Sequence, residues 1–126
     1  MTYLVRPADP KNDAAAVLGL WDRNSWPADR GRYMWMYEES APLPSFLWLA
    51  MTRAGETVGS AGLLGRRVRI GPGEAVVGQA VNLVVDARHR TLGPAVQLQR
   101  AVTASLGPRP TCRCLDALPP PRVGPP

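Results

Sequence analysis

Two helices are predicted between residues 9 and 39, the first of them from apolar side chains at helical spacing. Between residues 9 and 24, apolar positions recur at intervals of three and four, at Ala14, Val17, Leu18 and Trp21. This stripe predicts a helix with Asp9 at its N-cap. Pro27 favours the start of a second helix that continues to Glu39. Ahead of both helices, the alternation of apolar and polar side chains over residues 2–7 predicts a short strand.

From residue 46 onward the pattern becomes that of strands. The apolar run 46–51 and the segment 57–64 are separated by a short turn, which predicts a hairpin. A second turn at 71–73 leads into residues 74–85, a longer strand covered on both faces near its end. A last helix is expected over 93–106, with one apolar face. The predicted fold class is α/β, more narrowly α+β: a mostly antiparallel sheet flanked by helices, in the order β-α-α-β-β-β-α.

The segment 107–126 differs in composition from everything before it. Seven of these twenty residues are proline, which neither a helix nor a central strand accepts. We therefore expect one domain over 1–106 and a disordered tail rich in proline and arginine over 107–126. The two cysteines, Cys112 and Cys114, are too close for an ordinary disulfide and too few for a zinc site, so no metal is expected.

The net charge of the protein and the placement of its basic residues limit the kinds of molecule that it is expected to bind. The formal net charge is +5, from fourteen Arg and one Lys against ten acidic residues. Such an excess suits nucleic acid, anionic lipid or a phosphorylated cofactor. The basic residues are not interleaved with aromatic ones, which disfavours nucleic acid. No apolar stretch is long enough to span a membrane and no signal peptide is visible, so a cytoplasmic protein without membrane contact is expected.

A basic turn after the strand 74–85 is the strongest chemical signal. Gly93 allows close approach of a ligand to the backbone, and Pro94 suits the first position of the following helix. The first amides of a helix have no partner within the helix and bind anions, and Arg88 and Arg90 add positive charge. Strand, turn and helix together predict a phosphate site, whereas the simpler interpretation is a connection with solvated arginines.

The pattern Arg90-x-x-Gly93-x-Ala95 resembles the acetyl-CoA pyrophosphate loop of the GNAT (Gcn5-related) N-acetyltransferase superfamily. The order of elements over residues 2–106 resembles that fold as far as its third helix. The resemblance implies an enzyme that transfers acetyl from acetyl-CoA to an amine of a small molecule or protein. It also implies that the pantetheine arm lies beside the preceding strand, where a backbone N–H polarises the thioester carbonyl. The cofactor-binding residues expected are Leu83, Val84, Val85, Arg88, Arg90, Thr91, Leu92, Gly93, Pro94 and Ala95.

Candidates for catalysis are few. Asn82 could orient a water and Glu74 could act as a base, although each is also an ordinary polar strand residue. His89, between two arginines, is interpreted as a surface turn residue. Many family members place a tyrosine acid on a fourth helix, and no tyrosine follows Tyr37 here. The large residues 33–37 suit either core packing or an acceptor pocket.

The elements that follow the third helix in the GNAT fold have no counterpart after Leu106. We therefore expect a truncated GNAT-like domain, and we interpret the tail as a frameshifted or prematurely ended continuation. The alternative is a non-catalytic remnant that binds CoA or phosphate, or an interaction module. Such a module completes its sheet with another chain, forming a homo-oligomer through the exposed sheet edge.

Overall fold

A four-stranded antiparallel sheet forms the centre of the computed structural model, which describes residues 3–39, 45–90 and 93–106. The strands are β1 (Leu4–Pro7), β2 (Ser45–Met51), β3 (Thr57–Ile70) and β4 (Gly73–Val85). The helices are α1 (Ala14–Arg23), α2 (Arg30–Tyr33) and α3 (Pro94–Leu106). A π-helical turn (Met34–Glu38) continues α2, and a 3₁₀ turn (Ala87–His89) follows β4. This order confirms the predicted fold class.

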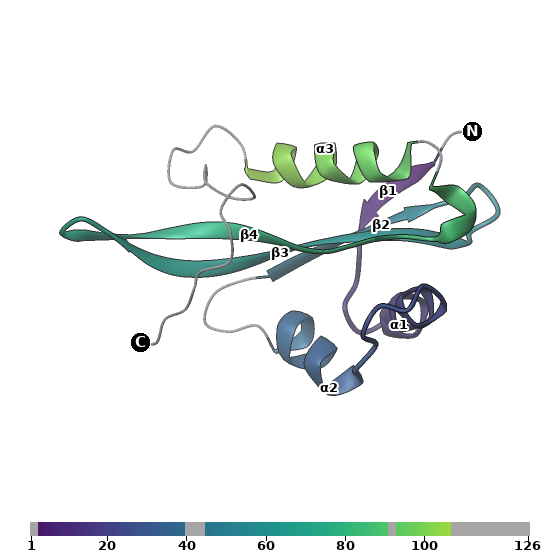
Figure 1. Ribbon diagram of the computed structural model, residues 1–126, viewed down its shortest axis with the longest axis horizontal. Helices are drawn as coiled ribbons and strands as arrows, with labels where there is room; N and C mark the ends of the chain where they lie inside the picture. Colours follow the sequence, from purple (N-terminus) through teal and green to yellow (C-terminus); the bar gives the residue numbers. More distant parts are fainter. Residues whose placement is uncertain (1–2, 40–44, 91–92, 107–126) are drawn as a thin grey trace.

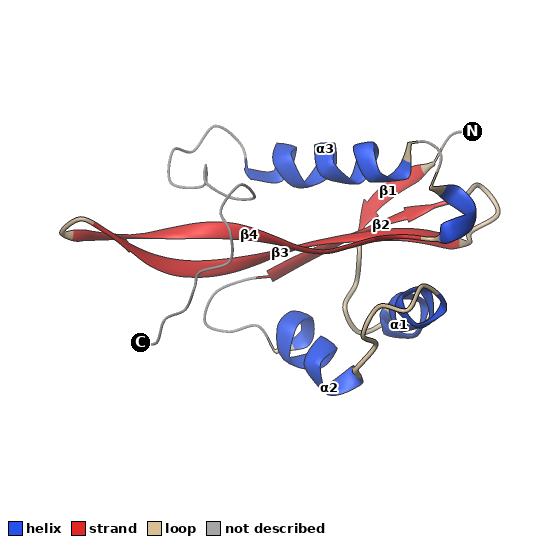
Figure 2. Cartoon of the chain, viewed as in Figure 1, coloured by secondary structure: helices blue, strands red, loops and turns tan. Residues whose placement is uncertain are grey.

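The sheet lies between two layers of helix. Its strand order is β1-β2-β3-β4, so β1 and β4 are the edge strands among the described residues. Figure 1 shows α3 on one face of the sheet and α1 with α2 on the other. The same view coloured by secondary structure shows the β3–β4 hairpin extending past the ends of the helices (Figure 2).

Each face of the sheet has its own hydrophobic core. On the α1 and α2 side, Leu20 and Leu49 are fully buried and pack in one cluster with Tyr33. On the α3 side, Leu98 is fully buried and packs with Trp48 of β2. Because helices cover both faces, β2 is buried at consecutive positions rather than alternate ones, which explains its unbroken apolar run.

β3 is longer than its sequence pattern predicted. We expected the strand to end at Leu64, but it continues to Ile70 and pairs with β4 along its whole length. The arginines at 66, 67 and 69 flank Val68 and precede Ile70, so charged and apolar side chains continue through the strand. An exposed strand tolerates such charged residues well, so the cluster of arginines does not end β3.

The helix starts also differ from the prediction. Asp9 does not cap α1; its Oδ1 accepts from the backbone N–H of Lys11 at 3.2 Å in a turn that precedes the helix, which begins at Ala14. The second helix begins at Arg30 because Asp29 caps it, accepting from Gly31 N and Arg32 N. A short polar side chain thus fixes the start of α2, whereas the N-cap residue of α1, Asp13, makes no side-chain cap bond.

Residues 107–126 lie outside the described residues, so the predicted boundary at 106 and the state of Cys112 and Cys114 stay predictions. No helix among the described residues combines the length and hydrophobicity needed to cross a membrane.

Candidate functional site

β4 ends at Val85, a 3₁₀ turn follows at Ala87–His89, and α3 starts at Pro94, close to the helix start that the sequence predicted. Gly93 immediately precedes the helix and has a φ of +64°, a conformation that favours glycine. The backbone N–H of Gln97 donates to the Gly93 carbonyl at 2.9 Å. The amides of Ala95 and Val96 precede this bond and so belong to the helix start, where amides lack intrahelical partners. Pro94 has no N–H to contribute and is fully buried.

A cavity of about 610 Å³ opens where the end of β4 meets the start of α3. Its volume is within the range of small-molecule sites. The lining residues are Asn24, Trp26, Leu83, Val84, Val85, His89, Arg90, Gly93, Ala95 and Val96. Six of the ten residues predicted for the cofactor are among them. Thr91 and Leu92 lie outside the described residues.

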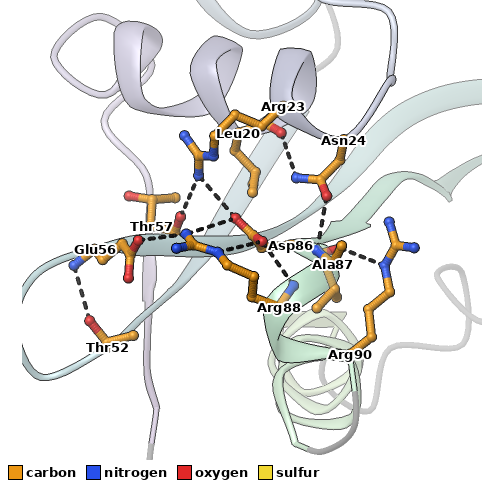
Figure 3. Close-up of polar contacts among 11 residues, drawn as sticks. Leu20, Arg23, Asn24, Thr52, Glu56, Thr57, Asp86, Ala87, Arg88 and Arg90 are labelled. Atoms are coloured by element: carbon orange, nitrogen blue, oxygen red, sulfur yellow. Dashed lines mark hydrogen bonds and ion pairs between the residues drawn. The ribbon is translucent and has the colours of Figure 1, made fainter.

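Arg88, by contrast, forms ion pairs with two carboxylates, those of Glu56 and Asp86. Its Nη2 donates to Glu56 Oε2 at 2.8 Å, and its Nε donates to Asp86 Oδ1 at 3.3 Å (Figure 3). Arg23 of α1 donates to the other oxygen of Asp86, Oδ2, at 3.3 Å. These bonds tie the turn to the β2–β3 connection, and Arg88 is not among the residues that line the cavity, so its predicted role as a phosphate ligand stays a prediction.

Asp86 is the centre of this network. Only 4% of the residue is exposed. Burial raises the pKa of its carboxyl, but hydrogen bonds from Arg88 and Arg23 outweigh burial and lower the pKa to about 2. Asn24 adds a second tie, because its Oδ1 accepts from Ala87 N at 2.9 Å while its Nδ2 donates to the Leu20 carbonyl at 2.8 Å. The C-terminus of α1 therefore holds the turn that follows β4 (Figure 3).

Arg90 is the arginine that faces the cavity. Its Nε donates to the Val85 carbonyl at 3.0 Å, which anchors the side chain against the end of β4. Its terminal amino groups have no partner within the part of the chain that the structure describes. His89 lines the same cavity, with Nδ1 in hydrogen-bond contact with the Tyr3 hydroxyl at 2.9 Å. The turn thus presents a cation and an imidazole next to the helix start.

β4 contains a bulge at Asn82. The pairing with β3 passes from Ser60↔Val84 to Gly62↔Val81, so β4 has one residue more than its partner over this interval. Asn82 has a φ of +55°, which asparagine tolerates better than most residues.

The Asn82 side chain is held at both of its polar ends. Its Oδ1 accepts from Trp26 Nε1 at 3.1 Å, and its Nδ2 donates to the Tyr37 hydroxyl oxygen at 2.6 Å. Burial raises the pKa of Tyr37 to about 12. The phenol is therefore protonated at neutral pH, and neither it nor the Asn82 amide is a base there.

A smaller pocket of about 50 Å³ adjoins the bulge on the α2 side. It is lined by Trp21, Trp26, Pro27, Asp29, Arg32, Met36 and Asn82. Trp26 lines both this pocket and the large cavity. Of the large residues 33–37, Tyr33, Met36 and Tyr37 are buried and Trp35 is 67% exposed.

Glu74 lies outside this site. It pairs with Arg69 at the start of β4, eleven residues before Val85, or roughly 35 Å along a strand. The structure therefore separates Glu74 from the cavity and leaves Asn82 as the predicted catalytic candidate beside it. Sequence reasoning missed Trp26 as a lining residue, and only its position between two predicted helices hinted at a site. Within the described residues, no three His, Cys, Asp or Glu side chains gather as a metal site.

No protein-family model matches the sequence, and no curated protein matches it. Solved structures do match. A GNAT family acetyltransferase of Staphylococcus aureus is 16% identical over 92% of this chain and 85% of its own, with a TM-score of 0.63. NAA60 of Arabidopsis thaliana, solved with a bisubstrate analogue, is 18% identical over 90% of this chain and 72% of its own, with a TM-score of 0.69.

A third match is the GNAT family N-acetyltransferase YhbS of Escherichia coli, solved in complex with CoA. It is 23% identical over 82% of this chain and 56% of its own, with a TM-score of 0.66. At these identities the likeness concerns the fold. The chain has the GNAT fold, which confirms the resemblance drawn from the order of its elements.

Proposed function

We propose that this protein is an N-acyltransferase that transfers acetyl from acetyl-CoA to an amine. One observation carries the proposal: the cavity joins the start of α3 to the edge of β4 that pairs with no strand among the described residues, with Arg90 on its wall. The GNAT fold supports it, because solved proteins of this fold are named as acetyltransferases. A cytoplasmic location remains part of the proposal.

The residues present fit acetyl-CoA at three points. The amides of Gly93 and Ala95 with the Arg90 guanidinium suit a diphosphate, and we add the amides of Thr91 and Leu92 to this group. The exposed edge of β4 suits an extended amide-containing arm, which can pair with a strand as a peptide does. The cavity lining beside that edge is largely apolar, from Leu83 to Val85. Bound acetyl-CoA supplies a thioester-activated acetyl group.

The acceptor amine approaches from the opposite side of Trp26. The small pocket there adjoins Asn82, whose neighbour Leu83 lines the cofactor cavity. Attack on a thioester requires a neutral amine, and neither Asn82 nor Tyr37 can remove its proton. We therefore propose that Asn82 orients the acceptor or a water rather than acting as a base. The acceptor is an amine of a small molecule or a protein.

The test measures CoA binding and acetyl transfer in the wild-type protein and in two matched glycine variants. Isothermal calorimetry with CoA and 3′-dephospho-CoA measures binding, and thiol release from acetyl-CoA with a panel of amines measures transfer. Gly93→Asp places a carboxylate beside the diphosphate site and should abolish CoA binding. Gly71→Asp is the control, because Gly71 has a similar φ of +58° but lies in the distal hairpin turn. Equal CoA affinity in both variants would count against the site.

A second candidate is a CoA-binding module without catalysis, which pairs with another chain. The observation that favours it is the edge of β4, which no other strand of the described part of the chain covers and where Leu83 is 40% and Val76 42% exposed. This candidate predicts CoA binding without thiol release for any amine. It also predicts a homodimer in light scattering that variants with proline on the β4 edge lose.

A further inference from the structure

A turn after α1 fixes one wall of the small pocket beside Asn82. The backbone N–H of Trp26 donates to the Trp21 carbonyl at 2.9 Å, and Ser25 in this turn has a φ of +58°. The indole Nε1 of Trp26 donates to Asn82 Oδ1 at 3.1 Å, so both the backbone and the side chain of Trp26 are held. The wall that Trp21 and Trp26 give the pocket is therefore formed before any ligand binds.

The start of α2 gives the pocket another wall, which carries two charges. Asp29 and Arg32 both line the pocket. Asp29 caps the helix: its Oδ1 accepts from Gly31 N at 2.9 Å and from Arg32 N at 3.4 Å, which offsets part of its negative charge. The Arg32 guanidinium forms an ion pair with no carboxylate among the residues that the structure describes. The charge left uncompensated on this wall is therefore positive.

The charge of Arg32 reaches the polar groups around Asn82. Burial raises the pKa of Tyr37, whereas the positive charge of Arg32 acts on the same phenol in the opposite direction. The Tyr37 hydroxyl in turn accepts from Asn82 Nδ2 at 2.6 Å. Asn82 lines the small pocket and its neighbour Leu83 lines the large cavity. An anion at Arg32 and an amine at the edge of the large cavity can therefore belong to one short molecule.

The size of the pocket limits the kind of anion that it can hold. Its volume is about 50 Å³, and a single water needs roughly 10–15 Å³. The pocket therefore accepts a group of only a few non-hydrogen atoms, such as a carboxylate. Carboxylates also suit arginine, because two parallel N–H groups of the guanidinium meet the two oxygens.

We propose that the acceptor is a small amino acid, and that Arg32 binds its carboxylate while its amine points toward the thioester. The inference rests on the proposed acyl transfer and names the acceptor class for it. Arg32 is the specificity-determining residue, whereas Trp26 and Asp29 shape the pocket. A protein lysine or a simple alkylamine has no carboxylate to place at Arg32 and should be a poorer acceptor.

The test compares small amino acids with their carboxamides as acceptors. Glycine and β-alanine carry a carboxylate, whereas glycinamide and β-alaninamide have nearly the same size without that charge. Thiol release from acetyl-CoA gives kcat and KM for each amine in wild type, Arg32→Gln and Arg32→Lys. Because every variant meets the same amines, differences in their intrinsic reactivity cancel when the ratio of acid to amide is compared between variants.

Wild type should prefer the acids. Arg32→Gln should raise KM for the acid about 10-fold with little change for the amide, because it loses a charge-assisted hydrogen bond at an exposed position. Arg32→Lys should keep an intermediate preference, since lysine retains the charge without the planar fork. Arg30→Gln is the matched control, because Arg30 also lies on α2 and is exposed but lines neither the pocket nor the cavity.

A second measurement follows binding without turnover. The indole N–H of Trp26 gives a ¹H–¹⁵N NMR signal that Trp26→Phe identifies by its loss. With CoA bound, β-alanine should shift this signal in wild type and in Arg30→Gln at concentrations that leave it unchanged in Arg32→Gln.

The outcomes separate the two levels of the argument. If wild type releases thiol with no amine, the proposed function fails and the acceptor class fails with it. If amines are acetylated but the ratio of acid to amide is the same in wild type and Arg32→Gln, only the role of Arg32 is overturned. A preference for diamines over amino acids would also overturn it, because the pocket would then take a cation beside Asp29.

Discussion

Replacing Asp86 with asparagine removes one charge from the network that holds the turn after β4. Asparagine keeps an oxygen in place of Asp86 Oδ1, which accepts from the backbone N–H of Arg88 at 3.0 Å. The variant therefore loses the charge while a similar shape and one hydrogen bond are kept. The two guanidinium groups, of Arg88 and Arg23, lose their shared carboxylate.

The size of the effect follows from the pKa of Asp86, which is lowered from 3.8 to about 2. Because each pKa unit corresponds to about 1.4 kcal/mol, the ionised form is stabilised by on the order of 2 kcal/mol. The side chains of Arg23 and Arg88 are 47% and 64% exposed, so solvent screens part of this interaction. We expect Asp86→Asn to lower the free energy of unfolding by about 1–2 kcal/mol at pH 7.

The sign of the pH dependence is fixed by the direction of the shift. The folded-state pKa lies below the unfolded-state pKa, so the contribution of Asp86 is complete above pH 5 and is lost as the pH falls toward 2. About half should be gone at pH 3. Wild type and variant should therefore converge in acid.

Urea denaturation followed by tryptophan fluorescence at pH 7, 5, 4 and 3 measures this difference. Asp22→Asn is the control, because Asp22 is an exposed residue of α1 with no side-chain partner among the described residues. A difference between wild type and Asp86→Asn that stays constant from pH 7 to 3 would refute the electrostatic argument. So would an equal loss in Asp22→Asn.

Two further changes test the packing around the bulge and under α3. Gly62→Ala places a Cβ against the Tyr37 hydroxyl, so it should displace the partner of Asn82 and cost about 1–3 kcal/mol, measured as the unfolding midpoint in urea. An unchanged midpoint would show that Tyr37 moves freely. Leu98→Ala, at a fully buried position, should cost about 2–5 kcal/mol in the same assay, whereas Val96→Ala, 53% exposed, should cost little; equal costs would contradict the assigned face of α3.

The parts of the site that could be predicted from the sequence are those with local causes. Gly93 and Pro94 mark the start of α3 because backbone conformation and the missing N–H act at the residue itself. The exposed arginine at 90 and the apolar end of β4 follow from the same short segment. Together they give the phosphate turn and one wall of the cavity.

The features of the site that the sequence did not predict depend on contacts between residues that are distant in the sequence. Arg88 and Arg90 look equivalent in the sequence, yet Arg88 meets Glu56, 32 residues away, and only Arg90 lines the cavity. At the bulge, the Asn82 carbonyl accepts from Ser60, and Ser60 accepts in turn from Trp21, 39 residues before it. Such contacts exist only once β3 and β4 are in register and α1 has packed on the sheet. The proposed phosphate site is therefore a local feature of the sequence, whereas the bulge in β4 is a property of the assembled fold.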